Sequence, residues 1–404
     1  MKHGRWAKLL LVAAPLLIGF GAGCGDFWQA PANTSTTGTC TTNCTTATSG
    51  KFYILNAGTT PQIVGDSIVS GKLTALSGSP WTLEGTPYAM AIDRINGNFL
   101  IVSMTSGVFS YPITNGVLGT AVATSQDLVV EAIQVDATDS WLIEAIPVAG
   151  GVTIGAVPIV SATGASNGAE KAVSFAVANA SVQTGGMAIS GDNANIFVSL
   201  GAGGTIVVPF NAAATKGTNP LSTRATTIPV ATTGGSALSV GVDPGTTPRL
   251  FYIGETLAFG GTAGGLRVFN YSSLGGTTIT QAAGSPITSG GLAPNFILPA
   301  ASGDYVYVAN GTGTSSAGNV AGFTITAGSA ATPTYAVATD SSAAAGVQPL
   351  GLAEDSTGTF LFEVGSLGSP YFDAYIFDTT TLGQLDSQIT STAAAGSIAI
   401  VAAP

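Results

Sequence analysis

The chain has 404 residues, with 11 Lys and Arg against 21 Asp and Glu, which gives a formal net charge of −10. Charged residues make up only 8% of the chain, whereas a typical soluble domain has about 25%. An acidic chain without a basic stripe argues against nucleic-acid binding and against charge-driven binding to anionic membrane surfaces.

The N-terminus has the pattern of a secretory signal. Lys2, Arg5 and Lys8 form a positively charged region, and residues 9–20 are an apolar stretch that is too short for a membrane-spanning helix. The following Gly-Ala-Gly-Cys, residues 21–24, resembles a bacterial lipobox, in which Cys24 becomes the lipidated N-terminus. Gly21 departs from the lipobox pattern, which favours Leu there, and the alternative is an ordinary secreted protein cleaved near Ala22.

Removal of residues 1–23 would leave a strongly acidic chain without histidine. The three bases of the signal leave 11 − 3 = 8 bases against 21 acids, a net charge of 8 − 21 = −13, and the one His is His3. The mature chain therefore has no Ser-His-Asp or Cys-His nucleophilic site, no His general base and no His-ligated zinc or copper.

Residues 24–50 are predicted to be a tether. The stretch from residue 32 to residue 50 is almost entirely Thr, Ser, Asn and Gly, which is typical of a flexible linker. Cys40 and Cys44 lie inside it, and we expect them to form a disulfide in an oxidising compartment. No other Cys or His is available to complete a metal site with them.

Residues 51–404 contain a repeated strand–turn–strand unit. Its clearest copies are residues 87–102, PYAMAIDRINGNFLIV, and residues 349–364, PLGLAEDSTGTFLFEV. Most copies are followed by a third strand, such as GLRVFNY at residues 265–271, and then by a looser fourth. Four antiparallel strands per repeated unit indicate the blades of an all-β propeller, which closes as a single domain.

The repeat predicts seven blades. Six inner strands are expected to start near Tyr88, Glu131, Gly186, Leu238, Asn295 and Leu350. Residues 396–401, GSIAIV, match a seventh inner strand. We predict that this last strand pairs with the strand that begins near Phe52 and closes the ring, which removes unpaired sheet edges. Because the spacing after Asp136 is stretched, six and eight blades stay open as alternatives.

Four aspartates end inner strands at matching positions: Asp93, Asp136, Asp243 and Asp355. Such a row could suggest a metal ring, but residues 355–358, DSTG, have Asp first and Gly fourth, as in a type I turn. We therefore interpret these side chains as acceptors of turn N–H groups. No metal site and no cofactor are predicted from them or from the glycine runs.

The connections that lead into the inner strands are the expected location of a ligand site, at the mouth of the central channel. The candidate ligand-binding residues there are Tyr88, Glu131, Gln183, Asn295 and Gln348. Glu84 and Glu131 are the candidates for a general acid or base. Two carboxyl groups on neighbouring blades would also suit a divalent cation, but a glutamate in such a connection is more often a solvated loop residue.

Several motifs resemble one family. DYVYVAN at residues 304–310 is close to the aromatic-Val-aromatic-Val-Ala-Asn second strand of the seven-bladed β-propeller lactonases, and FYILNA at residues 52–57 is a variant of it. LTALSGSPW at residues 73–81 and GSPI at residues 284–287 resemble the family's passage from third to fourth strand. Residues 51–404 thus resemble 6-phosphogluconolactonase-like, YVTN-repeat propellers, and this resemblance implies the seven-bladed fold.

The lactonase chemistry does not carry over with the motifs. Lactonising relatives use polar clusters that include His and Arg near the channel, whereas this chain has no His after residue 3. Its arginines in the repeat region are scattered: Arg94, Arg224, Arg249 and Arg267. A phosphorylated substrate would also require a basic cradle.

We therefore expect an extracytoplasmic, lipid-anchored propeller that acts as a binding or scaffolding module of the cell envelope. Gly25 follows Cys24 where an inner-membrane retention signal would have Asp, which favours the outer membrane. An envelope protein or a carbohydrate is the expected ligand. One alternative is a lactone hydrolase with Glu84 or Glu131 as its base, and another is a structural surface protein with a Thr/Ser-rich skin.

Overall fold

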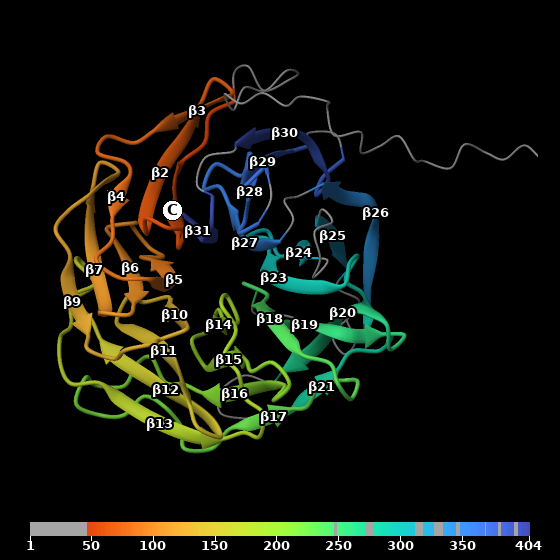
Figure 1. The fold of residues 1–404 in the computed structure, drawn as a ribbon. Helices are drawn as coiled ribbons and strands as arrows, with labels where there is room; N and C mark the ends of the chain where they lie inside the picture. The colour runs from red at the N-terminus through yellow and green to blue at the C-terminus, as the bar shows by residue number, and fades with distance from the viewer. Residues whose placement is uncertain are drawn as a thin grey trace, which may run out of the picture.

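The computed structural model describes residues 47–245, 249–271, 278–311, 318–326, 334–344, 348–367, 369–378, 381–391 and 395–404. Within these residues the strands form seven antiparallel sheets arranged as the blades of a ring (Figure 1). The predicted all-β, seven-bladed propeller is confirmed. Cys24, Cys40 and Cys44 lie outside the described residues.

The blades are numbered 1 to 7 from the N-terminus. Blade 1 contains β1 (Lys51–Asn56), β2 (Gln62–Val69), β3 (Lys72–Ala75), β4 (Trp81–Thr82) and β31 (Ser397–Ala402). Blade 2 contains β5 (Pro87–Ile92), β6 (Phe99–Met104), β7 (Gly107–Thr114), β8 (Val117–Leu118) and β9 (Val122–Ser125). Blade 3 contains β10 (Ala132–Val135), β11 (Trp141–Val148), β12 (Gly151–Pro158) and β13 (Lys171–Ala176).

The remaining blades follow the same order. Blade 4 contains β14 (Met187–Ile189), β15 (Asn195–Ser199), β16 (Thr205–Pro209) and β17 (Thr226–Ile228). Blade 5 contains β18 (Ala237–Val242), β19 (Leu250–Phe259), β20 (Ala263–Tyr271), β21 (Ile279–Gln281) and β22 (Ile287–Thr288). Blade 6 contains β23 (Ala293–Pro299), β24 (Tyr305–Gly311), β25 (Asn319–Thr326) and β26 (Thr334–Ala344). Blade 7 contains β27 (Pro349–Glu354), β28 (Phe360–Gly365), β29 (Phe372–Phe377) and β30 (Leu385–Ser391).

The second strand of each blade is apolar along nearly its whole length because neighbouring blades cover both of its faces. In β6 all six residues are buried. Leu100 and Val102 pack against blade 1 in a cluster that contains Tyr53, whereas Phe99 packs toward blade 3 in a cluster that contains Leu142. Alternate side chains of a strand point to opposite faces, so each second strand contributes one row of side chains to each of two interfaces between blades.

The ring closes as predicted through β31. This C-terminal strand pairs antiparallel with β1, with Phe52 opposite Ala402 and Leu55 opposite Ala399. Blade 1 therefore takes its inner strand from one end of the chain and its other strands from the opposite end. The edge of β1 is thus covered by β31, which lies beside the strands of blade 1 in Figure 1.

The fourth strand differs from the prediction in three blades, where it is divided into two short pieces. Both β3 and β4 pair with β2, both β8 and β9 pair with β7, and both β21 and β22 pair with β20. In blades 1 and 5 the break falls at Gly-Ser-Pro, residues 78–80 and 284–286. Proline has no N–H to donate to a sheet ladder, so the strand cannot continue through these positions.

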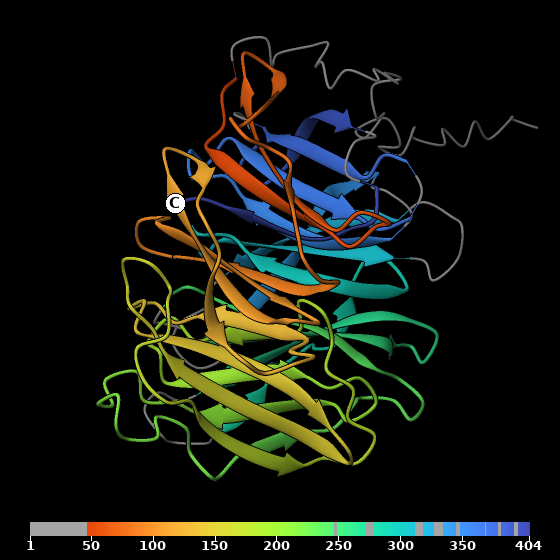
Figure 2. The same cartoon turned by 60° about the vertical axis from the view of Figure 1, so that its left-hand side comes forward.

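Two faces of the ring are distinguished by their loops. The connection face carries the connections into the inner strands and the hairpins between second and third strands, and the turn face carries the turns between inner and second strands. Figure 2, which turns the ring, shows the blades lying one behind another with loops at both ends of the strands.

Most of the turn-face aspartates bind turn N–H groups, as interpreted from the sequence. Asp93 accepts hydrogen bonds from the backbone N–H groups of Ile95, Asn96 and Asn98. Asp136 accepts three from Thr138, Ser140 and Trp141, and Asp243 accepts one from Gly245. Asp355 differs, because it accepts from the backbone N–H of Gly50 at 2.7 Å and from the Thr357 hydroxyl. It thereby links the turn of blade 7 to the start of blade 1.

Candidate functional site

The predicted channel residues lie at the connection-face ends of four inner strands. Tyr88 is the second residue of β5, Glu131 directly precedes β10, Asn295 lies in β23 and Gln348 directly precedes β27. Gln183 lies in the longer connection into β14. All five are partly exposed, and Glu84, in the connection between β4 and β5, is exposed.

Three of these side chains form hydrogen bonds within the fold. Asn295 donates from Nδ2 to the carbonyl of Pro349 at 2.9 Å, which links the inner strands of blades 6 and 7. Gln183 donates to the carbonyl of Ser181 at 2.7 Å, and Gln348 accepts from the Ser366 hydroxyl at 3.3 Å. These bonds hold the connections in place.

The two candidate catalytic carboxyl groups have separate surroundings. Burial raises the pKa of Glu131. Glu84 lies near Tyr111, where burial and the Glu84 charge raise the pKa of the Tyr111 hydroxyl to about 12. In the described part of the chain neither glutamate belongs to a group of three or more side chains that could hold a metal ion.

The central channel is narrow and mainly apolar beneath these residues. Its cavity has a volume of about 70 Å³ and is lined by inner-strand residues such as Met90, Ile133 and Ile400. Gly185 approaches Phe296 of β23 so closely that a Cβ atom at Gly185 would lie 2.8 Å from the phenyl ring. The connection into β14 thus reaches across the channel to blade 6 and restricts it.

A second group of acidic side chains lies between blades 2 and 3. At the fourth residue of the second strand, the seven blades have Ile54, Val102, Glu144, Val198, Ile253, Val308 and Glu363. Five of these are aliphatic and pack toward the preceding blade. Glu144 and Glu363 therefore place carboxyl groups in interfaces that the repeat otherwise fills with Val or Ile.

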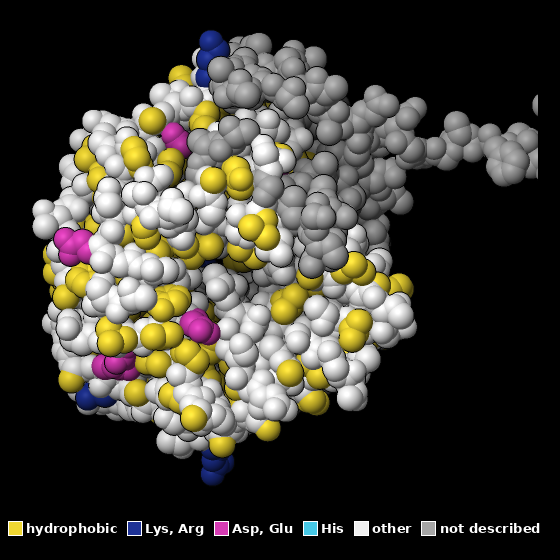
Figure 3. All heavy atoms as spheres, viewed as in Figure 1, with side chains coloured by type: hydrophobic (Ala, Val, Ile, Leu, Met, Phe, Trp, Pro, Cys, Tyr) yellow, Lys and Arg dark blue, Asp and Glu magenta, His cyan; other side chains and the backbone are white. Residues whose placement is uncertain are grey.

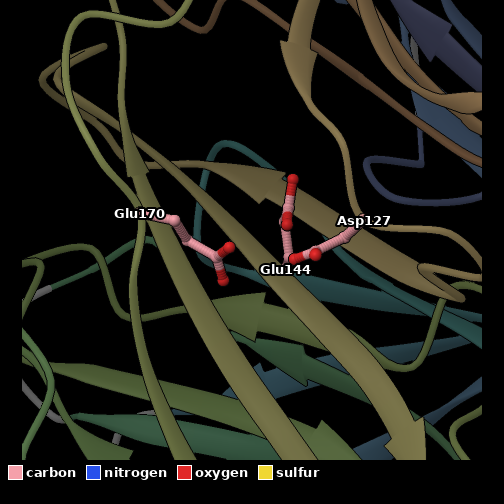
Figure 4. A group of neighbouring side chains, drawn as sticks. All are labelled: Asp127, Glu144 and Glu170. Carbon is pink, nitrogen blue, oxygen red and sulfur yellow. The ribbon is translucent and has the colours of Figure 1, made fainter.

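Glu144 lies in a cluster with Asp127 and Glu170. One carboxylate oxygen from each of the three lies within 4.8 Å of the others. Figure 4 shows Asp127 and Glu170 approaching Glu144 from opposite sides. Asp127 comes from the connection between β9 and β10, and Glu170 directly precedes β13. Gly155 of β12, opposite Glu144, makes room for them, since a Cβ atom at Gly155 would lie 2.3 Å from Oε1 of Glu170.

The cluster concentrates negative charge in a buried place. Glu144 is fully buried, and Asp127 and Glu170 are partly buried. Burial, followed by the charges of Glu170 and Asp127, raises the pKa of Glu144 well above its usual value. Burial and contact with Asp127 raise the pKa of Glu170 to about 7. Oxygen ligands in this arrangement suit either a shared proton or a hard cation.

Other buried acids of the second strands have partners of a different kind. In blade 5, Glu255 forms an ion pair with Arg267 at 2.7 Å. In blade 7, Glu363 lies opposite Asp373. Burial raises the pKa of Asp373 to about 7, although contacts with Gln388, Glu363 and Tyr375 lower it. The blade 3 cluster thus differs from both, since it contains three acids and no base.

Neither Glu144 nor Glu363 is among the site residues predicted from the sequence. The signal that identifies them is an acid inside an otherwise apolar strand, in WLIEAI and FLFEVG. That signal becomes specific only when the seven second strands are aligned at their first residues. The loops between them vary in length, so the sequence alone does not fix this alignment.

Within the described residues no helix is long and apolar enough to cross a membrane.

Comparison with known proteins identifies the fold. No protein-family model and no curated protein matches the chain. Among solved structures, a putative 6-phosphogluconolactonase from Bacteroides fragilis is similar with a TM-score of 0.65 and 14% identity, over 89% of this chain and 99% of that chain. A putative 6-phosphogluconolactonase from Bacteroides uniformis gives a TM-score of 0.61 and 14% identity, over 87% and 98%.

The periplasmic gluconolactonase of Pseudomonas aeruginosa is similar in the same way. It has a TM-score of 0.59 and 14% identity, over 89% of this chain and 100% of that chain. The likeness covers nearly the whole of each structure, so it shows that this chain has the fold of 6-phosphogluconolactonase-like seven-bladed propellers. At this identity the likeness concerns the fold alone.

Proposed function

We propose that this chain is a lipid-anchored propeller of the cell envelope, attached through Cys24, whose connection face binds an envelope protein. The observation that supports this proposal is the distribution of large apolar side chains that are exposed. Six of the ten in the described residues lie on the connection face: Leu128, Val129, Val148, Phe259, Leu292 and Leu367.

Exposed apolar groups on one face are typical of a protein interaction site. Figure 3 shows hydrophobic side chains spread over the visible face of the ring, with few charged side chains among them. A carbohydrate would be expected to stack on aromatic rings, whereas Phe259 is the one aromatic residue among the six. This composition favours a protein partner over a sugar.

The binding face can be tested with two matched triple variants. Leu128→Ser, Val148→Ser and Phe259→Ser together remove apolar groups from the connection face. Val69→Ser, Ile95→Ser and Leu382→Ser remove groups that are also exposed but lie elsewhere. Cross-linking in intact cells should give an adduct that the first variant loses and the second retains. Loss from both variants or from neither would contradict the proposal.

The anchor is tested separately with Cys24→Ser. The wild-type protein should incorporate radiolabelled palmitate and sediment with membranes, and the variant should do neither. If the variant still sediments with membranes, attachment does not depend on Cys24.

The second candidate function is lactone hydrolysis with Glu84 or Glu131 as the base. The raised pKa of Glu131 is the observation in its favour, and the narrow apolar channel is the observation against it. Assays with unphosphorylated sugar lactones should show no turnover above the spontaneous rate. Turnover that disappears in Glu131→Gln or Glu84→Gln would replace the binding proposal with an enzymatic one.

A further inference from the structure

The Asp127–Glu144–Glu170 cluster contains a buried oxygen atom without a hydrogen-bond donor. Ser125 donates from its hydroxyl to Oε2 of Glu144 at 3.3 Å. Oε1 of Glu144 is fully buried and accepts no hydrogen bond. A buried carboxylate oxygen without a partner is costly in free energy, so a group that binds this oxygen would stabilise the folded chain.

No basic side chain in the described part of the chain forms an ion pair with this cluster. Among the described residues the ion pairs are those of Arg249 with Asp192 and of Arg267 with Glu255. The charges that act on Glu144 come from Glu170 and Asp127, and both are negative. Three neighbouring carboxyl groups cannot all be ionised in a partly buried place without a counter-charge.

The geometry leaves room for one ion. The three ligand oxygens lie within 4.8 Å of one another. Calcium binds oxygen at about 2.4 Å, so two oxygens on opposite sides of one calcium ion lie about 4.8 Å apart. The missing side chain at Gly155 opens the space in which Glu170 lies beside Glu144. Asp127 and Glu170 are partly exposed, which gives an ion access from solvent.

We propose that Asp127, Glu144 and Glu170 bind one divalent cation of the calcium class between blades 2 and 3. The Ser125 hydroxyl and water complete the oxygen ligands. The ion links the connection from blade 2, through Asp127, to the second strand of blade 3 and to the residue directly before its fourth strand. It thus fastens together two blades whose interface contains an acid where five other blades have Val or Ile.

The experiment measures calcium binding to the purified full-length protein after removal of metals with EDTA. Titration calorimetry with CaCl₂ should give one site, and saturating calcium should raise the Tm by several degrees. Asp127→Asn and Glu170→Gln should each weaken calcium binding at least tenfold. Asp304→Asn, which neutralises an exposed acid of blade 6, should bind calcium within twofold of the wild type.

The variants should fold without metal, because each removes one of three mutually repelling charges. In EDTA their Tm should equal or exceed that of the wild type. A wild-type protein that shows neither heat of binding nor a shift in Tm up to 10 mM CaCl₂ would overturn the proposal. So would an unchanged affinity in Glu170→Gln and Asp127→Asn. A response to MgCl₂ alone, with none to CaCl₂, would overturn the calcium assignment.

Discussion

Glu255 and Arg267 are the clearest case of a buried ion pair that also has several hydrogen-bond partners. Both side chains are nearly inaccessible, with exposed fractions of 1% and 9%. Arg267 also donates to the carbonyl of Pro229 and to Gln281, and its guanidinium lies 4.9 Å from the centre of the Phe269 ring. Glu255 in turn accepts from the backbone N–H of Ala231. This network fixes the interface of blades 4 and 5.

Arg267→Met should therefore be strongly destabilising. It leaves the Glu255 carboxylate buried without its cation, which costs about 3–5 kcal/mol. Adding Glu255→Gln should restore part of the loss, because the amide carries no charge. Arg249→Met is the control, since the Arg249–Asp192 ion pair is more exposed and should cost about 0–1 kcal/mol. Urea unfolding curves give the free energy of unfolding of the wild type and of the three variants. Equal losses for Arg267→Met and Arg249→Met would contradict this account.

Asp136 is the residue through which the turn of blade 3 is organised. Its carboxylate accepts three backbone N–H groups at 2.7 to 3.1 Å. Asp136→Ala should lower the free energy of unfolding by about 2–4 kcal/mol, because hydrogen bonds to a charged group contribute about 1.5–3 kcal/mol each and solvent replaces some of them. Asp136→Asn should lower the free energy of unfolding by a smaller amount. Asp304→Ala, at an exposed aspartate, should be nearly neutral in the same denaturation assay.

At the scale of the strand, β31 has a role that no other inner strand has. It pairs with β1, and Ile400 is buried between blades 1 and 7. Deletion of residues 397–404 would expose the edge of β1 and uncover the first and last blades together. We expect the truncated chain to lose its cooperative thermal transition and to aggregate in size-exclusion chromatography. Deletion of Pro404 alone is the control, and a truncated chain that unfolds like the wild type would contradict the closure.

The sequence predicts the strands and their arrangement more completely than it predicts the candidate sites. The strand–turn–strand copies and the incomplete last copy predicted seven blades, with six and eight left open, and the closure by β31, because apolar runs and turn residues are local signals. The split of the fourth strand at Gly-Ser-Pro also has a local cause. The Glu144 cluster does not, because Asp127, Glu144 and Glu170 come from separate elements, and only the packing of blade 2 against blade 3 brings them together.

The hydrogen-bond and packing partners of the predicted channel residues could not be predicted from the sequence either. Asn295 binds a carbonyl in the next blade, and Gly185 packs against Phe296, more than 100 residues away in the chain. The sequence places polar residues correctly on the connection face. Whether such a residue faces a ligand or a neighbouring backbone group depends on contacts between blades.

Across the whole molecule, burial raises the pKa of several carboxyl groups. It raises the pKa of Asp66 to about 6 and those of Asp139, Glu170 and Asp373 to about 7. Burial also raises the pKa values of Glu131, Glu144, Asp243 and Glu255. Asp93, beside Asp139, shifts the opposite way, because hydrogen bonds from Asp139 and from turn N–H groups outweigh its burial. The folded chain therefore holds more protons than the unfolded chain between about pH 4 and pH 7.

This difference fixes the sign of the pH dependence. Stability falls with rising pH wherever the folded state binds more protons than the unfolded state. In EDTA, which removes any cation that would offset the charge, the Tm should be highest near pH 4 and fall by several degrees by pH 8. Differential scanning fluorimetry at constant ionic strength measures the Tm at each pH. Glu170→Gln should reduce the fall, because Gln does not titrate, whereas Asp304→Asn should leave it unchanged. A Tm that rises steadily from pH 5 to pH 8 would mean that these carboxyl groups are ionised and paired in the folded protein.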